Sequence, residues 1–473
     1  MRKTFMGVRL RTLREQRGLT QAALAAQLDL SPSYVNQLEN NQRPLSVPVL
    51  LRLQASFGVD LQLFSEDEEA RLLAQLQDAV AGAGGMVPMA EVQALAQQMP
   101  ALAQRVIQLH KQARDAQERL EVTAAGIVGD RGALLAVAPM QPHEEVRDFF
   151  YARHNHIGEL DALAEAVYAE LKPPSSLASD LAPVLMQRLA RAHGIAIQAA
   201  TPTDLQGLRA FDPIGKTLTL NPELEPGQQA FQLATQLAFL EAAGTIDRLV
   251  AGGTFQSDEA KGLARIGLAS YFAGSLVLPY AVFLNAAESL GYDIDLLARR
   301  FGVGFETVCH RLSTLQRPDA RGVPFFFVRV DRAGNVSKRQ SATDFHFSRT
   351  GGTCPLWNVY EAFSQPDKVL TQLATMPDGR TYLWIARCVT HSSGGFGAPA
   401  RTFAVALGCD RRHASRLVYA RGLVLDDNES ATPIGPGCKV CERLGCEQRA
   451  FPALGRPLQV DENLRLKEPY ASS

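Results

Sequence analysis

The feature that most constrains this chain lies near its start, between Leu10 and Pro48. Thr20 and Ser31 each stand where a capping hydroxyl would begin a short helix, and Pro32 takes the first helical position, where a missing N–H is harmless. Apolar residues at helical spacing predict the inner face of a small bundle: Val8, Leu10, Leu13, Leu24, Ala25, Leu28, Val35 and Leu38, with Val47, Leu50 and Leu51 starting a closing helix. The helix after Ser31 then turns Ser33, Tyr34, Asn36 and Gln37 outward, which favours an element that enters the major groove of DNA.

The charge of the first 64 residues fits such a contact. They hold eight basic and four acidic residues, a net charge of +4, whereas the whole chain of 473 residues carries −1. A local basic surface on a nearly neutral protein suits phosphate contacts. No apolar run approaches the roughly 20 residues that span a bilayer, and Met1 to Phe5 lead into no signal-peptide segment, so we expect a cytoplasmic protein.

This N-terminal stretch resembles the Cro/C1-type helix-turn-helix family of phage repressors (the XRE family). The resemblance implies that Gln21 contacts a phosphate, that Ser33, Tyr34 and Gln37 face base edges, and that Asn40 and Arg43 hold the DNA backbone. It also implies a buried ion pair between Arg14 and Glu39. The predicted DNA-binding residues are Gln21, Ser31, Ser33, Tyr34, Asn36, Gln37, Asn40 and Arg43.

Between residues 67 and 141 an apolar stripe at heptad spacing predicts helices. It consists of Val92, Leu95, Met99, Leu102, Val106, Leu109, Ala113, Ala116 and Leu120. Pro100 interrupts the stripe, which argues against one long straight helix. Two interpretations stay open, a dimer seam and an intramolecular helical hairpin.

The middle of the chain, residues 142–320, is predicted to be mostly helical, with short strands near 195–197 and 217–220. It resembles the ImmA/IrrE type of metallopeptidase domain, whose first helix carries His-Glu-x-x-His for zinc. The matching positions hold Thr235, Gln236 and Phe239, and no acid stands between Ile266 and Ser270. We therefore expect a domain without catalytic activity.

From residue 321 onward, strands are predicted near 323–330, 368–375, 381–389 and 401–406, and a helix over 413–421. A mixed sheet of this kind is typical of PAS- or GAF-type sensor domains. Aromatic and cationic side chains favour a site for an acyl chain on a phosphorylated carrier, with Arg349, Trp357, Arg387, His391 and Arg412 as candidates. The alternative is a core tryptophan with solvated arginines.

Three of the seven cysteines, Cys438, Cys441 and Cys446, have the spacing C-x2-C-x4-C, which is typical of a metal or iron–sulfur site in a reducing compartment. A fourth ligand must come from elsewhere, and Cys409 is the nearest candidate, followed by Cys354. Zinc and an iron–sulfur cluster both fit thiolates. Cys309 and Cys388 fall in helical and strand patterns, and we expect core thiols there.

Taken in this order, the parts resemble the family of short-chain fatty acyl transcriptional regulators. The predicted fold is multidomain and mainly α with a C-terminal α/β part, divided at 1–66, 67–141, 142–320 and 321–473. The resemblance implies a homodimer that binds operator DNA, regulates propionate, methylcitrate or glyoxylate-cycle genes, responds to acyl-CoA, and carries an iron–sulfur cluster, favoured as 4Fe-4S. Two alternatives are a metal- or redox-responsive repressor and a stress regulator with a partner-cleaving middle domain.

Overall fold

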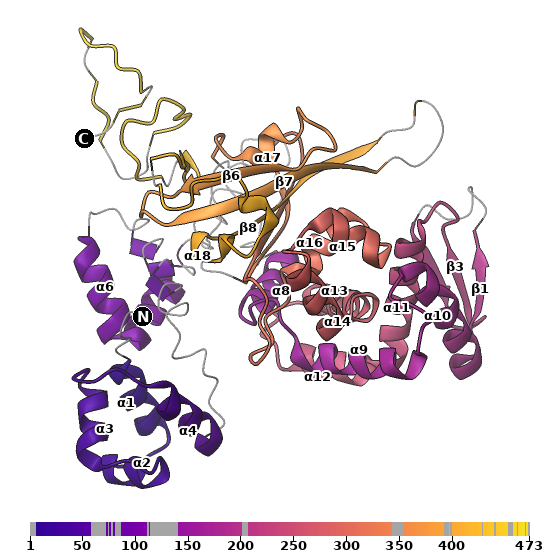
Figure 1. The fold of residues 1–473 in the computed structure, drawn as a ribbon, viewed down its shortest axis with the longest axis horizontal. Coiled ribbons are helices and arrows are strands. Elements are labelled where there is room, and N and C mark those ends of the chain that lie inside the picture. The colour runs from indigo at the N-terminus through magenta and orange to yellow at the C-terminus, as the bar shows by residue number, and fades with distance from the viewer. Residues whose placement is uncertain are drawn as a thin grey trace, which may run out of the picture. The chain divides into compact units, whose positions relative to one another are not determined.

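The computed structural model describes residues 6–57, 87–110, 141–200, 207–342, 354–391, 400–427, 429–438, 441–452, 457–460 and 462–468, and the pieces 72–73, 75–76, 79–80, 113, 397 and 470–471 (Figure 1). It divides into two compact units. The first comprises Met1–Pro139, Asp344–Gly351 and Pro436–Ser473, and the second Met140–Thr343 and Gly352–Gly435.

The first unit begins with a four-helix bundle, α1 (Gly7–Gln16), α2 (Gln21–Gln27), α3 (Pro32–Glu39) and α4 (Val47–Phe57). The predicted caps are confirmed, because the hydroxyl of Thr20 accepts from the N–H of Ala23 and that of Ser31 from the N–H of Tyr34. The core of this bundle consists of Met6, Leu10, Leu24, Ala25, Leu28, Val35, Leu38, Val49 and Leu53. Leu51, expected inside, is exposed, since α4 turns Val49 and Leu53 inward.

The heptad stripe lies on α6 (Met89–Gln98) and on a second helical run over residues 100–110. The break falls at Met99, before Pro100, as predicted. Val92, Ala96 and Ala103 are buried against Leu72 and Leu76 of the same chain, which favours the intramolecular hairpin for this part of the stripe. Met99, Leu102 and Leu109 are exposed and remain available to a second copy. Ala116 and Leu120 lie outside the described residues.

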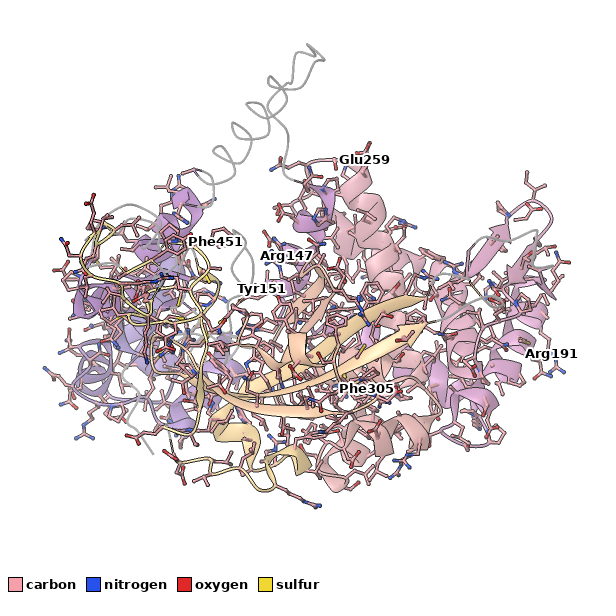
Figure 2. The ribbon with its side chains drawn as sticks, turned by 90° about the horizontal axis from the view of Figure 1, so that it is seen from above. Arg147, Tyr151, Arg191, Glu259, Phe305 and Phe451 are labelled. Carbon is pink, nitrogen blue, oxygen red and sulfur yellow. The ribbon has the colours of Figure 1, made fainter. Side chains whose placement is uncertain are left out.

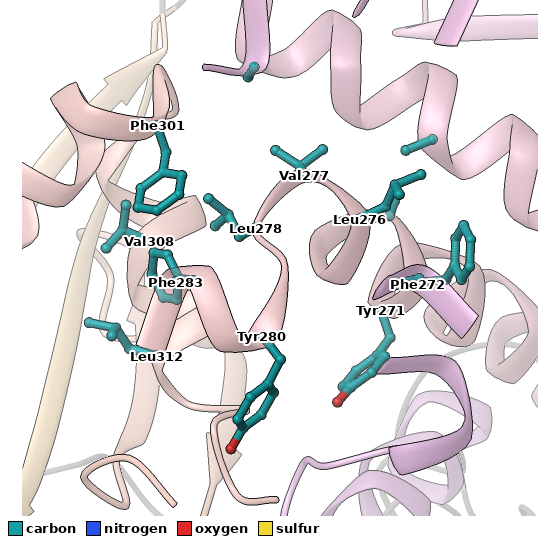
Figure 3. Close-up of a cluster of buried hydrophobic side chains, with 14 of the residues drawn as sticks. Tyr271, Phe272, Leu276, Val277, Leu278, Tyr280, Phe283, Phe301, Val308 and Leu312 are labelled. Carbon is teal, nitrogen blue, oxygen red and sulfur yellow. The ribbon is translucent and has the colours of Figure 1, made fainter. Parts of the chain in front are cut away.

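The second unit opens with helices around a small sheet. The strands β1 (Ala196–Ala199), β2 (Arg209–Asp212) and β3 (Thr217–Leu220) lie in the order β1-β3-β2, with β1 parallel and β2 antiparallel to β3. The helices are α8 (Pro142–Tyr151), α9 (Gly158–Leu171), α10 (Ala178–His193), α11 (Pro226–Glu241), α12 (Ala243–Ala251), α13 (Asp258–Val277), α14 (Tyr280–Ser289), α15 (Ile294–Phe301) and α16 (Phe305–Leu312). Figure 3 shows the aromatic and aliphatic side chains of α13 to α16 that meet in its core, among them Phe272, Phe283 and Phe301.

A six-stranded sheet completes the second unit, in the order β5-β4-β8-β7-β6-β9. Its strands are β4 (Phe326–Val330), β5 (Val336–Ser341), β6 (Leu370–Thr375), β7 (Thr381–His391), β8 (Arg401–Asp410) and β9 (Thr432–Pro433). All neighbours are antiparallel except β6 and β9. The short helix α17 (Asn358–Glu361) follows Trp357. The helix predicted over 413–421 is wrong as one element: α18 (Arg411–Ala414) ends early and a 3-10 turn, η2 (Val418–Ala420), follows.

One continuous hydrophobic core explains why the middle helices and this sheet form a single unit. Leu383 and Ile385 of β7 and Val405 and Leu407 of β8 belong to the same buried cluster as the helices α9 to α16. One face of the sheet therefore packs against the helices of this unit. Among the described residues, no single helix is long and apolar enough to cross a membrane; α13 and α14 pass that test only together, across a 61° bend.

Candidate DNA-binding and effector-binding sites

A buried ion pair anchors the predicted recognition helix to the rest of the bundle. Arg14 of α1 donates to both carboxylate oxygens of Glu39 at the end of α3, at 2.6 and 3.1 Å. The side chain of Glu39 has no exposed surface. Burial by itself raises the pKa of Glu39, but the hydrogen bonds from Arg14 and Gln21 outweigh burial and hold the pKa below its usual value. The ion pair that the resemblance implied is confirmed.

Gln21 continues this chain of polar contacts. Its side-chain amide donates to Glu39 Oε2 at 2.7 Å, and it lies 3.5 Å from Asn36 Oδ1. Asn36 in turn accepts from Asn40 Nδ2 at 2.9 Å, and Arg11 donates to Asn40 Oδ1 at 3.3 Å. We expect Gln21 to contact a phosphate. Its amide nitrogen is therefore already hydrogen-bonded to another residue of the bundle.

The remaining predicted DNA-binding residues lie on one surface, formed by α3 and the loop after it. Ser33, Asn36, Asn40 and Arg43 are exposed, and Tyr34 and Gln37 are partly exposed. The guanidinium of Arg43 lies over the ring of Tyr34, 5.5 Å from its centre. Ser31 is held as the helix cap, which leaves it a positioning role. The surface brings together a donor–acceptor set suited to base edges with a cation suited to phosphate.

The positions of the peptidase motif lie on α11, where the resemblance placed them. Thr235 and Gln236 are buried, and the hydroxyl of Thr235 donates to the carbonyl of Phe231. Arg209 of β2 donates to Gln236 Oε1 at 2.5 Å, and its guanidinium lies over the ring of Phe239. Among the described residues, no group of three or more His, Cys, Asp or Glu side chains is placed to hold a metal ion. An amide and a fixed guanidinium supply neither a zinc ligand nor a general base.

A second polar cluster, which the sequence did not reveal, lies in the core of the same unit. Asp161 of α9 accepts from the hydroxyl of Tyr271 at 2.8 Å and from Arg311 at 2.7 Å, and His156 Nε2 lies 3.2 Å from its carboxylate. Burial opposes ionisation of Asp161, but Arg311 and His156 outweigh it and hold the pKa well below its usual range. The cluster ties α9, α13 and α16 together.

The described residues among those predicted to bind the acyl ligand lie at separate places on the second unit. Trp357 is 1% exposed and stacks on Trp384 of β7, with ring centres 5.0 Å apart. This position agrees with the alternative interpretation, in which the tryptophan belongs to the hydrophobic core. A ligand could reach the Trp357 ring only by displacing Trp384 from it. Arg387 donates to Asp295 at 2.7 Å and lies over the ring of Phe305, which Figure 2 labels beside the sheet.

The other candidates lie far apart on the sheet. His391 ends β7 opposite Arg401, whereas Arg412 follows Asp410, which pairs with Tyr382 at the other end of β7. At about 3.3 Å per residue, the nine residues from Tyr382 to His391 separate these ends by roughly 30 Å. His391 and Arg412 are both exposed. Arg349 lies outside the described residues.

The cysteines divide between the two units. Cys409 is fully buried on β8, and burial raises the pKa of its thiol far above the ordinary value. In this structure Cys409 belongs to the hydrophobic core of the second unit, and its role as a fourth ligand stays a prediction. Cys354 is buried as well, and so are Cys309 and Cys388, the two expected core thiols.

The loop that carries Cys438, Cys441 and Cys446 is organised around Arg449. This arginine is 3% exposed and donates to the carbonyls of Cys438 at 3.1 Å and Cys441 at 3.3 Å. Glu468 balances its charge at 2.9 Å and also accepts from the N–H of Gly445. The N–H of Ala450 donates to Cys438 Sγ at 3.4 Å. Among the described residues, Cys438, Cys441 and Cys446 are not brought together as a set of metal ligands, so a metal or iron–sulfur group on this loop stays a prediction.

Comparison with known proteins places three family models along the chain. A helix-turn-helix model matches residues 10–64, an IrrE N-terminal-like domain matches 190–313, and the C-terminal domain of a short-chain fatty acyl coenzyme A regulator matches 314–470. The order is the one that the sequence predicts.

Relatives match the chain over its whole length. The HTH-type transcriptional regulator PrpR of Mycobacterium tuberculosis is 50% identical over 474 residues, which cover 100% of this chain and 96% of the relative. The regulator RamB of the same species is 48% identical over 99% of both chains. A propionyl-CoA carboxylase regulator of Cereibacter sphaeroides is 42% identical over 99% of this chain and 98% of its own. A solved structure of a Mycobacterium tuberculosis transcriptional regulator matches with a TM-score of 0.67 at 52% identity, over 70% of this chain and all of that one.

Proposed function

Because this chain belongs to the family of helix-turn-helix transcriptional regulators with a C-terminal short-chain fatty acyl coenzyme A regulator domain, we propose that it binds operator DNA under the control of a short-chain acyl-CoA. The controlled genes serve propionate or related short-chain acyl metabolism, since one relative is named a propionyl-CoA carboxylase regulator and the C-terminal family model is that of a short-chain fatty acyl coenzyme A regulator. DNA as the target implies that the protein works in the cytoplasm.

The observation that carries this proposal is the surface of α3, together with its ion-paired support. Arg14, Glu39 and Gln21 fix the end of α3 inside the bundle, so that Ser33, Asn36 and Gln37 face outward on a helix held in one orientation. A helix fixed in this way loses little conformational freedom when it enters a major groove. Arg43 and Asn40 supply the adjoining backbone contacts, and Gln21 contributes once DNA competes for its amide.

We propose that the functional form is a homodimer, so that two recognition helices meet successive major-groove faces. The exposed Met99, Leu102 and Leu109 offer an apolar seam for the second copy. The effector then acts by favouring one dimer geometry. It shifts DNA affinity only by as much as its own affinity differs between the two geometries.

The middle domain, proposed as residues 142–320, takes no catalytic part in this scheme. Gln236 has neither the charge nor the proton affinity of a general base, and Arg209 occupies its oxygen. This domain instead transmits structural changes that begin in the six-stranded sheet, because its hydrophobic core continues into that sheet. A structural change in the sheet therefore acts on a closely packed domain and not on a flexible linker.

We propose that Cys438, Cys441 and Cys446 hold an iron–sulfur cluster or zinc. When bound, such a group would fix the backbone of this loop, and an iron–sulfur cluster would add sensitivity to oxidation. Arg449 and Glu468 already hold the loop carbonyls and the Gly445 amide in place. Anaerobic purification followed by iron and zinc analysis decides between the two, and a Cys438→Ser variant should lose the metal.

The central experiment measures operator binding by fluorescence anisotropy, with duplexes from the promoter region of the chain's own gene. Acetyl-, propionyl- and butyryl-CoA are titrated, with free CoA as the control. We expect at least one acyl-CoA to shift the affinity by about 5- to 150-fold, the usual range of allosteric coupling. A protein that ignores all of these duplexes, with and without acyl-CoA, would refute the proposal.

The second candidate is a redox- or metal-responsive repressor in which the cysteine loop is the switch. The hydrogen bond from the N–H of Ala450 to Cys438 Sγ favours it, because it ties this sulfur to the backbone of the loop. Cys438→Ser separates the candidates. If the acyl-CoA response survives in this variant with intact operator binding, the cysteine loop is not the switch.

A further inference from the structure

Lys338 occupies an unusual place on the sheet of the second unit. It lies on β5, an edge strand, opposite Arg329 of β4. On this face of the hairpin, Gln340 accepts from Ser313, the ring of Phe327 packs against His310, and Arg329 donates to Glu306 at 2.8 Å. All three contacts reach α16 or the residue after it. The side chain of Lys338 therefore points toward α16 and is only partly exposed.

The ammonium group of Lys338 is not held by a direct partner in the described part of the chain. Among the residues that the structure describes, Lys338 has no hydrogen bond and no ion pair. Glu306, the nearby carboxylate, is committed to Arg329, and Arg329 also donates to Ser337 Oγ at 3.0 Å. On the α16 side stands His310, which is half-buried and whose buried Nε2 has no hydrogen-bond partner in the described part of the chain. Burial, followed by the charges of Lys338 and Arg329, lowers the pKa of His310 far below its ordinary value, so it is neutral.

These surroundings favour the neutral amine of Lys338. Burial and the cation of Arg329 together outweigh the attraction of Glu306 and lower the pKa of Lys338 to about 8. At pH 7 roughly a tenth of such an amine is unprotonated, whereas an ordinary lysine near 10.5 has a few hundredths of a per cent. A desolvated lysine beside another cation is a typical protein nucleophile.

We propose that Lys338 is a covalent acylation site that accepts the acyl group of a short-chain acyl-CoA. This inference rests on the proposed function, which brings the thioester to the domain matched over residues 314–470. The amine nitrogen attacks the thioester carbonyl carbon, a C–N bond forms and the C–S bond breaks. Coenzyme A leaves as a thiolate and takes up the proton that the nitrogen loses. No oxidant or further reactant is needed.

Acylation changes the same contacts that make the amine reactive. It removes the positive charge of Lys338, and with it the repulsion that acts on Arg329 and His310. It also places a short apolar chain between β5 and α16. Because α8 packs on β5 as well, the modified side chain lies where three elements of one unit, β5, α8 and α16, come together. A transient rise in the concentration of acyl-CoA would thus leave an acyl group on Lys338 that remains after the bound effector has dissociated.

The test exposes the full-length protein to propionyl-CoA and follows each lysine by peptide mass spectrometry. Lys261 is the matched control, because it is exposed and its ion pair with Asp258 raises its pKa. We expect Lys338 to react at least tenfold faster than Lys261 at pH 7. Its rate should level off above about pH 8, while that of Lys261 keeps rising. Equal rates, or label on Lys261 alone, would overturn the proposal.

A second variant separates this proposal from the proposed function. Lys338→Arg keeps the charge and removes the reactive amine, so it should lose the label at this position and keep operator binding. A wild-type protein that responds to propionyl-CoA on the operator but stays unlabelled at Lys338 refutes only the acylation. A labelled protein without any operator response refutes the proposed function and leaves the acylation standing.

Discussion

The side-chain amide of Gln21 donates a 2.7 Å hydrogen bond to Glu39, the carboxylate that Arg14 already holds. A residue at the start of α2 is thereby tied to the end of α3 through a buried charge. The recognition helix is thus held at its C-terminal end by an ion pair, and at its N-terminal end by the Ser31 cap. DNA binding and the stability of the bundle share these residues.

The Arg14–Glu39 pair should make the bundle sensitive to acid. The folded pKa of Glu39 lies below its unfolded value of about 4.3, so the contribution is complete above that value and is lost as the pH falls through the folded pKa. Arg14→Met should destabilise the bundle by about 3 kcal/mol at pH 7, because it leaves a buried carboxylate with the amide of Gln21 and with Arg11, whose guanidinium is 3.6 Å away and half-exposed. Hydrogen exchange of peptides from α1 to α4 measures this. A loss below about 0.5 kcal/mol would show that the pair adds little.

Gln37→Ala should weaken binding to the specific operator by about 1–3 kcal/mol and change binding to random DNA little, because a bidentate amide reads a base edge. Gln27→Ala, an exposed glutamine at the end of α2, is the control. Competition anisotropy with specific and random duplexes gives both affinities. An equal loss on both duplexes would show that Gln37 does not read bases.

Arg43→Ala should weaken binding to every duplex and lower the slope of log affinity against log salt by about 0.9, since one phosphate contact is lost. The guanidinium is exposed and touches only the Tyr34 ring among the contacts that the structure gives it, so the fold should be unaffected. Titrations at four salt concentrations give the slope. An unchanged slope would remove Arg43 from the phosphate contacts.

Asp161→Asn should destabilise the second unit by about 3–5 kcal/mol, because it leaves the guanidinium of Arg311 buried without its counter-ion. Replacing both residues, Asp161→Asn with Arg311→Met, should recover part of the loss. Urea unfolding followed by tryptophan fluorescence reports on this unit, since Trp357 and Trp384 are both buried in it. A double variant no more stable than Asp161→Asn alone would contradict a charge-based cause.

The N-terminal bundle could be predicted in detail because its signals are local. The caps at Thr20 and Ser31 act over three residues, and the spacing of Leu24, Leu28 and Val35 depends only on helical periodicity. The same holds for the break before Pro100 and for the strands β3 and β4. The helix expected over 413–421 failed because apolar periodicity did not reveal that the chain turns after Ala414.

The effector region could not be predicted residue by residue. An aromatic ring beside arginines looks the same in a sequence whether it lines a pocket or a core, and only the stacking of Trp357 on Trp384 places it inside. The thiol spacing of Cys438 to Cys446 was visible, but nothing local showed that Cys409 faces a hydrophobic core.

The sequence by itself determined that the N-terminal bundle is a helix-turn-helix element, that the middle domain lacks the zinc ligands of its family, and in which order the domains follow. Helix caps, periodicity and ligand spacing are properties of neighbouring residues, and they survive any packing. Tertiary structure alone decided that Asp161 meets Arg311 across 150 positions, and that Lys338 lies on the side of β5 that faces α16, without a hydrogen bond or ion pair to any residue the structure describes. Such contacts depend on which faces the core buries together, and burial sets the charge state of the groups it encloses.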